Sequence, residues 1–201
     1  MLNNDLSQQI KRNFPYKPTE EQENAVKSFA EFLFSPSADS VFLMKGYAGT
    51  GKTTLTSALV RTLDLLQRKV ILLAPTGRAA KVFSGYAKHP AYTIHKKIYR
   101  QKVFSNETDN FVAHQNLHRN TLFIVDEASM IANEGLSGGH FGSGRLLDDL
   151  VQYVYNGLGC RLMLIGDTAQ LPPIGEEESP ALSVAALQGY GLEVTECVLT
   201  K

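Results

Sequence analysis

The sequence predicts an α/β fold, in which helices cover both faces of a parallel sheet. Four apolar runs rich in β-branched residues begin at Val41, Val70, Thr121 and Arg161. Each run is continuous rather than alternating, which is typical of strands that are buried on both faces. Helical patterns separate the runs, so strands alternate with helices along the chain.

Composition limits the size of the protein and its partners. The chain has 201 residues, of which 43% are hydrophobic, enough for one sizeable core. Lys plus Arg and Asp plus Glu each number 20, so no global basic field favours nucleic acid and any such contact must be local. The polar N-terminus and the lack of a membrane-length apolar run predict a soluble cytoplasmic protein. The two cysteines lack the spacing of a zinc site or a disulfide framework.

The chain divides into a short N-terminal extension, residues 1–18, and one domain, residues 19–201. Thr19 begins a helix N-cap pattern, with acidic residues in the first turn. Residues 98–120 depart from the strand and helix alternation: "KVF" and "NFVAH" flank the turn-rich "SNETD". This pattern predicts a small β-hairpin insertion.

A glycine-rich loop follows the first apolar run and satisfies G-x-x-x-x-G-K-[ST], the P-loop pattern. Glycine lets backbone N–H groups approach phosphates closely, and the helix that follows adds the positive end of its dipole. Lys52 would neutralise the β- and γ-phosphates, and the Thr53 hydroxyl would bind Mg²⁺. The alternative is a glycine-rich helix start that binds no nucleotide. The cofactors predicted are ATP and Mg²⁺, and the loop residues expected at the nucleotide are Gly46, Gly49, Thr50, Gly51, Lys52, Thr53 and Thr54.

An acidic pair, Asp126 and Glu127, follows the third apolar run, at the edge where open α/β sheets bind ligands. Asp126 would hold Mg²⁺ through water. Glu127 points elsewhere in an extended chain and would orient and deprotonate the attacking water.

The segment "IGDTAQLPPIG", residues 165–175, resembles motif III of superfamily 1B DNA helicases, and "GDTAQLPP" is similar to the RecD-like and Dda-like branches. The resemblance spans residues 19–175 and includes six motifs in family order. It implies the RecA-like first motor domain of an ATP-dependent 5′-to-3′ DNA helicase. It also implies that Gln170 contacts the γ-phosphate and senses hydrolysis; the alternative is a turn stiffened by proline.

Two further segments resemble the motifs of these helicases that contact DNA. "APTGRAAKVF" begins at Ala74, and a strand end turning into a helix N-terminus offers backbone N–H groups to phosphates. "YTIHKKIY" begins at Tyr92 and combines aromatic and basic residues. His95 by itself is more often a structural histidine. The residues that the resemblance places near single-stranded DNA are Pro75, Thr76, Gly77, Arg78, Thr93 and His95.

Gln22 resembles the glutamine that pairs with adenine in this family, although it could equally be a solvated helix residue. The hairpin insertion falls where the relatives carry a pin that splits the duplex. Phe104, or alternatively Phe111, would then be the wedge; both could instead pack the hairpin onto the domain.

The resemblance also defines what to expect of the whole protein. Superfamily 1B helicases have two RecA-like domains, and the second supplies arginines that stabilise the transferring phosphoryl group. The resemblance in this chain covers only the first domain. This chain alone is therefore expected to hydrolyse ATP weakly. The expected partners are single-stranded DNA and a duplex fork, with no membrane, and the protein is expected to be a monomer that joins a repair or recombination complex. A nucleotide-switched nucleic-acid-binding module with little hydrolysis and a Pif1-like or RNA-directed helicase remain alternatives.

Overall fold

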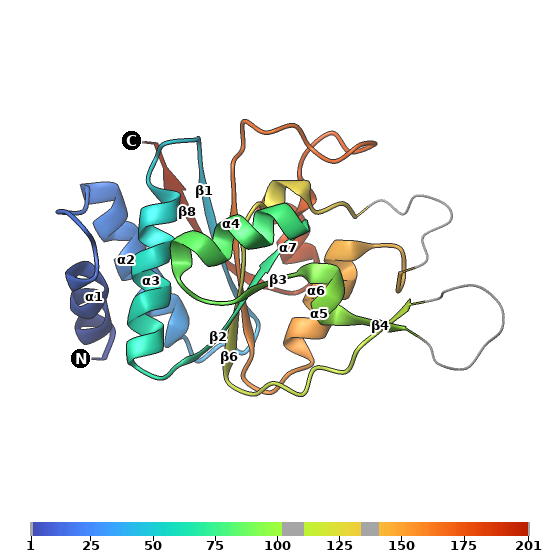
Figure 1. The fold of residues 1–201 in the computed structure, drawn as a ribbon, viewed down its shortest axis with the longest axis horizontal. Helices are drawn as coiled ribbons and strands as arrows, with labels where there is room; N and C mark the ends of the chain where they lie inside the picture. The colour runs from blue at the N-terminus through green and yellow to red at the C-terminus, as the bar shows by residue number, and fades with distance from the viewer. Residues whose placement is uncertain (1, 102–110, 134–140, 201) are drawn as a thin grey trace.

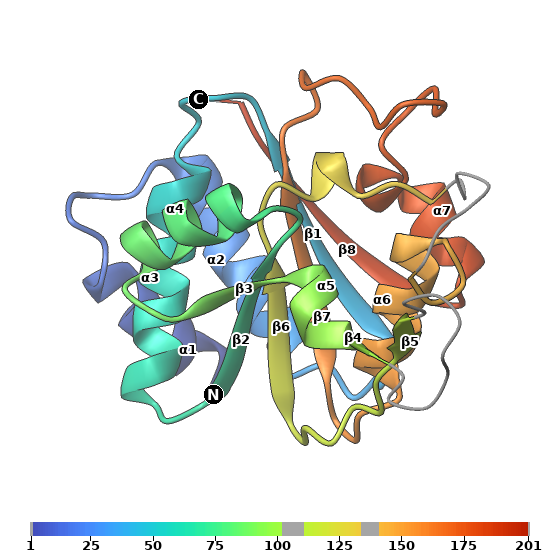
Figure 2. The same ribbon diagram turned by 45° about the vertical axis from the view of Figure 1, so that its right-hand side comes forward.

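The computed structural model describes residues 2–101, 111–133 and 141–200. Within these residues a sheet of six parallel strands runs through the molecule, with helices packed against both of its faces (Figures 1 and 2). The predicted α/β fold class is therefore confirmed. The strands of this sheet are β1 (Ser40–Gly46), β2 (Lys69–Ala74), β3 (Ala91–Thr93), β6 (Thr121–Val125), β7 (Arg161–Gly166) and β8 (Glu193–Leu199).

The order of the strands brings the segments that follow β1, β6 and β7 together at the C-terminal end of the sheet. The spatial order is β3-β2-β6-β7-β1-β8, and every neighbouring pair is parallel. The four apolar runs are the inner strands β2, β6, β7 and β1, whereas β3 and β8, which the sequence did not predict, form the edges. Because the strands are parallel, the C-terminal ends of β1, β6 and β7 lie together.

Helices divide between the two faces of the sheet. Phe42 and Met44 of β1 pack into a core with α1 to α4, and Val41 and Leu43 pack into another with α5 to α7. Figure 2 shows the two helical layers on either side of the strands. In the described part of the chain, no helix is long and apolar enough to cross a bilayer. The helices are α1 (Leu2–Arg12), α2 (Glu20–Leu33), α3 (Lys52–Leu65), α4 (Gly77–Ala87), α5 (Ile94–Ile98), α6 (Leu146–Tyr155) and α7 (Val184–Gly189), with short 3-10 turns η1 (Ala128–Met130) and η2 (Pro180–Leu182).

The two N-terminal helices, α1 and α2, precede β1 and the glycine-rich phosphate loop, residues 46–53. The Thr19 hydroxyl accepts a hydrogen bond from the backbone N–H of Gln22, and the Gln22 side-chain oxygen accepts one from the backbone N–H of Thr19. This capping box fixes the start of α2, as the sequence predicted. Within the predicted extension, α1 buries Leu6 and Ile10 in the same core as α2.

Within residues 98–120, where the sequence predicts a hairpin insertion, the structure describes an antiparallel pair of short strands, β4 (Tyr99–Gln101) and β5 (Phe111–Ala113). β4 ends at Gln101, just before the "KVF" segment, residues 102–104, for which the sequence predicts a strand. That segment lies outside the described residues. The Phe111 ring stacks on Phe141 with centroids 4.6 Å apart, and Phe111 O accepts a hydrogen bond from Gly142 N–H. Phe111 thus packs at the base of the insertion.

Candidate functional site

The phosphate loop joins β1 to α3 through a turn that only glycine adopts readily. Gly49 and Gly51 have φ of 82° and 83°, a left-handed conformation that costs other residues free energy. Gly46 lies against the end of β8, where an added Cβ would be 2.7 Å from Leu199 O. The loop therefore forms a tight cradle directly before the N-terminus of α3, the end of a helix that favours anions.

Lys52, the first residue of α3, is held across the loop. Its Nζ donates hydrogen bonds to Gly46 O at 2.6 Å and to Tyr47 O at 2.7 Å. Thr50 Oγ1 donates to the same Tyr47 carbonyl at 2.8 Å. The next residue, Thr53, is exposed at the helix start. The Lys52 ammonium group thus lies on the loop, and Thr53 lies in the first turn of α3 beside it.

Gln22 lies against this loop and is 3% exposed. Its side-chain oxygen is engaged by Thr19 N–H, and its amide nitrogen lies so close to Gly51 that an added Cβ there would collide with it. Gln22 therefore packs against the phosphate loop at Gly51 and supports the loop there, independently of any contact between its amide and a nucleotide.

The acidic pair begins where β6 ends. Asp126 Oδ2 accepts a hydrogen bond from the Tyr86 hydroxyl at 2.5 Å, and Oδ1 accepts one from Glu127 N–H at 2.9 Å. The pKa of Asp126 is raised, chiefly by burial and also by the charge of Glu127, although these two hydrogen bonds and the charge of Lys52 act in the opposite direction. Burial and the Asp126 charge raise the pKa of Tyr86 far above its usual range, so the phenol keeps its proton and acts as the donor.

Gln170 connects the loop after β7 to the acidic pair. Its Nε2 donates to Glu127 Oε2 at 3.0 Å, and its Oε1 accepts from Ser129 Oγ at 2.5 Å. Both ends of the amide are therefore oriented. The structure brings Glu127 and Gln170 together, although 43 residues separate them in the sequence.

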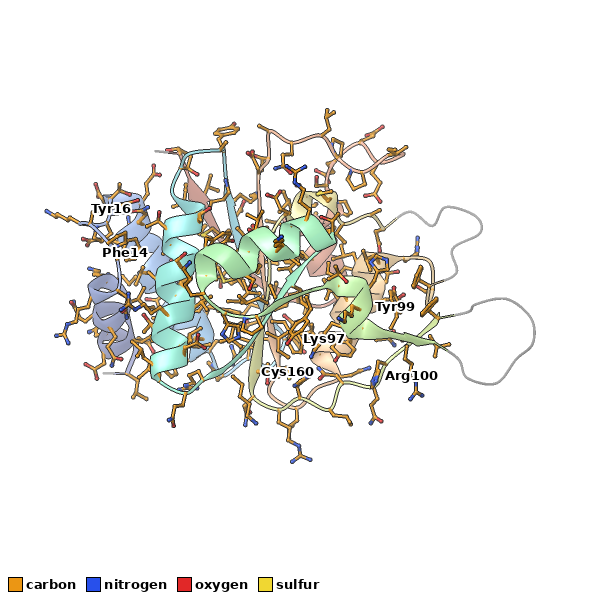
Figure 3. The ribbon with its side chains drawn as sticks, in the orientation of Figure 1. Phe14, Tyr16, Lys97, Tyr99, Arg100 and Cys160 are labelled. Carbon is orange, nitrogen blue, oxygen red and sulfur yellow. The ribbon has the colours of Figure 1, made fainter. Side chains whose placement is uncertain are left out.

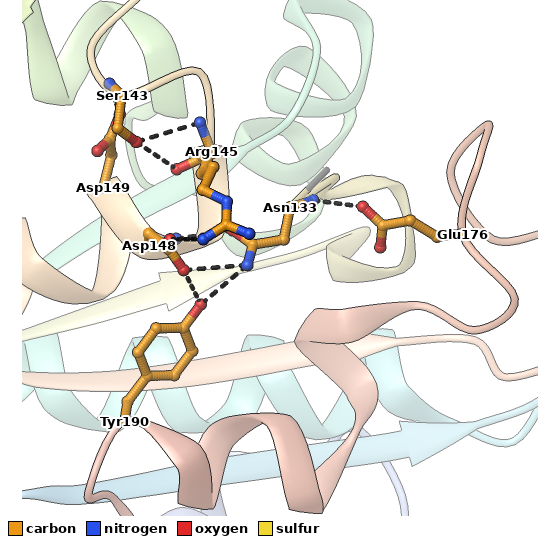
Figure 4. A network of polar contacts seen from close by, with 7 residues as sticks. All are labelled: Asn133, Ser143, Arg145, Asp148, Asp149, Glu176 and Tyr190. Carbon is orange, nitrogen blue, oxygen red and sulfur yellow. Dashed lines mark hydrogen bonds and ion pairs between the residues drawn. The ribbon is translucent and has the colours of Figure 1, made fainter. Parts of the chain in front are cut away.

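A polar network holds the segments that carry these residues (Figure 4). Asn133 N–H donates to Glu176 Oε1 at 2.5 Å, and the Asn133 side-chain nitrogen donates to Asp148 Oδ1 at 3.0 Å. The Tyr190 hydroxyl donates to the same oxygen of Asp148. Because Glu176 follows Gln170 in one loop, the network fixes that loop against the segment after β6 and against α6.

The residues around the loop enclose a cleft of about 440 Å³, a volume typical of small-molecule sites. Its basic, hydroxyl and carboxylate groups match the phosphates and the hard cation of a metal–nucleotide complex. Three residues predicted at the nucleotide, Gln22, Gly46 and Thr50, are not among the lining residues, and all three are buried. The lining comprises Tyr16, Ala48, Gly49, Gly51, Lys52, Thr53, Thr54, Tyr86, Asp126, Glu127, Ile165, Gly166, Asp167 and Gln170.

Two tyrosines of the lining were missed by the sequence reasoning. The Tyr16 hydroxyl lies 3.0 Å from Thr54 Oγ1, and Tyr16 sits on the side of the molecule where α1 and α2 lie (Figure 3). Tyr86 is three residues after Phe83, on the inward face of α4. The hydroxyl of a tyrosine that faces inward usually needs a hydrogen-bond partner. The sequence alone does not show that this partner is Asp126, 40 residues away.

The predicted nucleic-acid contacts follow two neighbouring strands. Ala74 of β2 pairs with Thr93 of β3, so the ends of these strands lie side by side. Thr76 caps α4 by accepting from Ala79 N–H at 3.2 Å. Pro75 is partly buried, while the three residues that follow it, Thr76, Gly77 and Arg78, are exposed.

The residues predicted in the second DNA segment are less exposed. Thr93 caps α5 by accepting from Lys96 N–H. His95 is partly buried, with its ring 5.0 Å from the Phe141 ring and 5.6 Å from the Tyr99 ring, and burial lowers its pKa. Phe104, the candidate wedge, lies outside the described residues.

A parallel α/β sheet with a G-x-x-x-x-G-K-T loop after one strand and an Asp–Glu pair after another defines a P-loop nucleotide-binding domain. The chain belongs to the AAA domain family, whose model matches residues 17–196.

Two of the similar proteins are DNA helicases, a narrower class than P-loop nucleotide-binding domains. The chain is 32% identical over 144 residues to the ATP-dependent RecD2 DNA helicase of Deinococcus radiodurans, covering 71% of this chain and 17% of that protein. It is 29% identical over 139 residues to the ATP-dependent DNA helicase Pif1 of Bdellovibrio bacteriovorus, covering 69% and 30%. An uncharacterised mimivirus protein, R530, is 28% identical over 181 residues, covering 79% and 34%. The chain thus spans about a third or less of the length of these relatives.

A solved structure agrees with these sequence matches. The crystal structure of Pif1 helicase from Candida albicans superposes with a TM-score of 0.55 at 18% identity, covering 92% of this chain and 40% of that one. This likeness shows a shared fold. The predicted resemblance to the RecD-like and related helicases, and the RecA-like P-loop fold that it implied, are confirmed.

Proposed function

We propose that the chain is the ATP-binding motor domain of a DNA helicase that couples ATP hydrolysis to movement along single-stranded DNA and to 5′-to-3′ unwinding of a fork. The observation that carries the proposal is the 3.0 Å hydrogen bond from Gln170 to Glu127, in a cleft that Lys52 also lines. It joins the residue proposed to activate water to the residue proposed to sense the γ-phosphate. Similarity to RecD2 and Pif1 helicases favours this function over other P-loop activities.

The chemistry proposed for the cleft follows from the side chains that line it. Lys52 would neutralise the β- and γ-phosphates, and Thr53 and Asp126 would hold Mg²⁺, since both offer hard oxygen ligands. Mg²⁺, when bound, supplies positive charge to the phosphate oxygens. Glu127 would accept a proton from the attacking water, with its carboxylate oriented by Gln170.

The remaining nucleotide contacts would come from the loop and from α2. Backbone N–H groups of the loop would surround the phosphates, while the Gln22 amide would reach the adenine. The loop residues proposed for this cradle are Gly46, Gly49, Thr50, Gly51 and Thr54.

Single-stranded DNA would bind across the ends of β2 and β3. The exposed start of α4 offers backbone N–H groups to phosphates, and Arg78 adds local charge to a chain whose formal charge is zero. Pro75, Thr76 and Gly77 would line this surface, with Thr93 and His95 beside it. Phe104 is proposed as the wedge at the fork. We further propose that the protein is cytoplasmic and acts as a monomer in DNA repair or recombination.

An unwinding assay on the full-length protein tests this function. Forked duplexes carrying either a 5′ or a 3′ single-stranded tail are mixed with ATP and Mg²⁺, and strand separation is followed. The proposal expects unwinding of the 5′-tailed substrate, which Lys52→Ala should abolish because phosphate neutralisation is lost. Nucleotide binding and hydrolysis without separation of either substrate would instead indicate a nucleotide-switched binding module.

A further inference from the structure

Tyr86 makes the contact in the cleft that the sequence motifs do not explain. It lies on α4, and its hydroxyl donates to Asp126 Oδ2 at 2.5 Å. The same side chain lines the cleft together with Lys52 and Thr53. The Tyr86 hydroxyl therefore contacts the acidic pair, in a cleft that the phosphate loop also lines.

Tyr86 is fixed by contacts on two sides. Its backbone carbonyl accepts a hydrogen bond from Ser57 Oγ on α3 at 3.1 Å. Its ring packs against Phe83, with centroids 5.2 Å apart and planes 33° from parallel, and Phe83 is fully buried. The phenol is therefore held in place by the helix that begins with Lys52 and by the core, so it acts as a fixed donor.

The second oxygen of Asp126 is also constrained, since Oδ1 accepts from Glu127 N–H at 2.9 Å. The terminal torsion of an aspartate is otherwise broad. With a donor on each oxygen, the carboxylate has a single orientation at the end of β6. Hydrogen bonds of this kind orient metal-ligating groups, and their loss typically lowers metal affinity by about 10- to 100-fold.

We propose that Tyr86 is a positioning residue for the divalent cation of this site: its hydroxyl holds the Asp126 carboxylate in the orientation that binds Mg²⁺ with Thr53. The inference rests on the proposed function in one respect, because it takes Asp126 as the carboxylate that holds Mg²⁺ through water. Tyr86 acts through Asp126, so its hydroxyl affects the cation requirement and not the phosphate cradle. The structure thus assigns a metal-tuning role to a residue of α4, outside the phosphate loop and the acidic pair.

The test uses Tyr86→Phe, which keeps the ring and removes only the hydroxyl. Binding of a fluorescent ATP analogue is measured first in EDTA and then across a Mg²⁺ titration. The inference predicts an unchanged affinity in EDTA and a rise of about tenfold in the Mg²⁺ concentration for half-maximal effect. It also predicts that hydrolysis recovers towards the wild-type rate at high Mg²⁺, which a damaged fold would not do.

Tyr99→Phe is the matched control. It removes an equivalent hydrogen bond, from the Tyr99 hydroxyl to Asp149 Oδ2 at 2.6 Å, on the side of the molecule opposite Tyr16 (Figure 3). This variant should leave the Mg²⁺ titration unchanged.

Each outcome decides the inference. A Mg²⁺ titration of Tyr86→Phe equal to that of the wild type overturns it while leaving the proposed function intact. An equal loss of affinity with and without Mg²⁺ would show a merely structural role and also overturns it. If wild-type protein binds the nucleotide with no response to Mg²⁺, the proposed metal site itself fails, and the inference with it.

Discussion

Glu127 has a backbone φ of 55°, a left-handed conformation that a residue with a side chain adopts at a cost of about 1 kcal/mol or more. The prediction that Glu127 lies in an extended chain is therefore wrong. Such conformations persist where the surroundings enforce them, and they cluster at functional sites. Here the enforcing contacts are visible: Glu127 N–H donates to Asp126, and its carboxylate accepts from Gln170. At the scale of the residue, backbone strain and side-chain orientation both point to Glu127 as the centre of the proposed chemistry.

The first prediction concerns Glu127→Gln. The amide oxygen of the new side chain can still accept from Gln170, but it cannot take a proton from water. We expect ATP turnover to fall by about 10²- to 10⁴-fold, the usual contribution of a general base, with nucleotide affinity unchanged. Steady-state hydrolysis and equilibrium binding measure the two quantities. Glu177→Gln, at an exposed position of the loop after β7, serves as the control, and a turnover of Glu127→Gln similar to that of this control would contradict the proposed role.

The second prediction compares two glycines of the phosphate loop. Gly49 and Gly51 have nearly equal φ, but an added Cβ meets open space at Gly49 and the Gln22 amide at Gly51. Gly49→Ala should therefore cost only the backbone strain. Gly51→Ala should lower the free energy of unfolding by about 0.5–1.5 kcal/mol more, because the Gln22 amide must move and give up its hydrogen bond with Thr19 N–H. Chemical denaturation of both variants measures the difference. Gln22→Ala combined with Gly51→Ala should recover part of the loss; equal stability of the two single variants would show that Gln22 does not brace the loop.

At the scale of secondary-structure elements, the inner strands were predictable and the edge strands were not. β1, β2, β6 and β7 are covered on both faces, so their sequences are continuous apolar runs. β3 has only three residues, and β8 mixes exposed, partly buried and buried positions in no regular order, so neither carries that signal. Tyr99, at the start of β4, is held by a hydrogen bond to Asp149, 50 residues away in the sequence. Such anchoring by a distant residue leaves no local pattern.

The third prediction concerns the aromatic cluster at the base of the hairpin, formed by His95, Tyr99, Phe111 and Phe141. Burial lowers the pKa of His95 from its ordinary value of about 6.5. The unfolded chain then binds the proton more readily than the folded one, so stability is full above that value and falls as the pH drops through it towards the lower folded pKa.

Thermal unfolding at about pH 7.5 and about pH 5.5 tests this dependence. His95→Gln should lose less stability on acidification than the wild type. Burial also lowers the pKa of His118. Because this histidine is present in both proteins, its effect on the pH dependence of stability is the same in each. An identical loss in the two proteins would show that His95 titrates normally.

At the scale of the whole molecule, parallel topology collects motifs that are far apart in the sequence. The sequence identified the loop after β1 by its glycine and lysine pattern, the acidic pair by its place after an apolar run, and Gln170 by the resemblance of its segment to a helicase motif. Because each of these segments follows a parallel strand, all three lie at the C-terminal end of the sheet. The contacts among them were not predictable. Gln170 to Glu127 and Tyr86 to Asp126 depend on helix and loop positions that only packing sets.

The most direct test of the central claim is the ATP hydrolysis rate of the full-length protein with and without a single-stranded DNA oligonucleotide. A motor that couples hydrolysis to movement should turn over ATP slowly alone and much faster with the oligonucleotide, and Glu127→Gln should abolish the stimulated rate. An RNA oligonucleotide of the same sequence serves as the comparison. Nucleotide binding with no stimulation by single-stranded DNA would contradict the account.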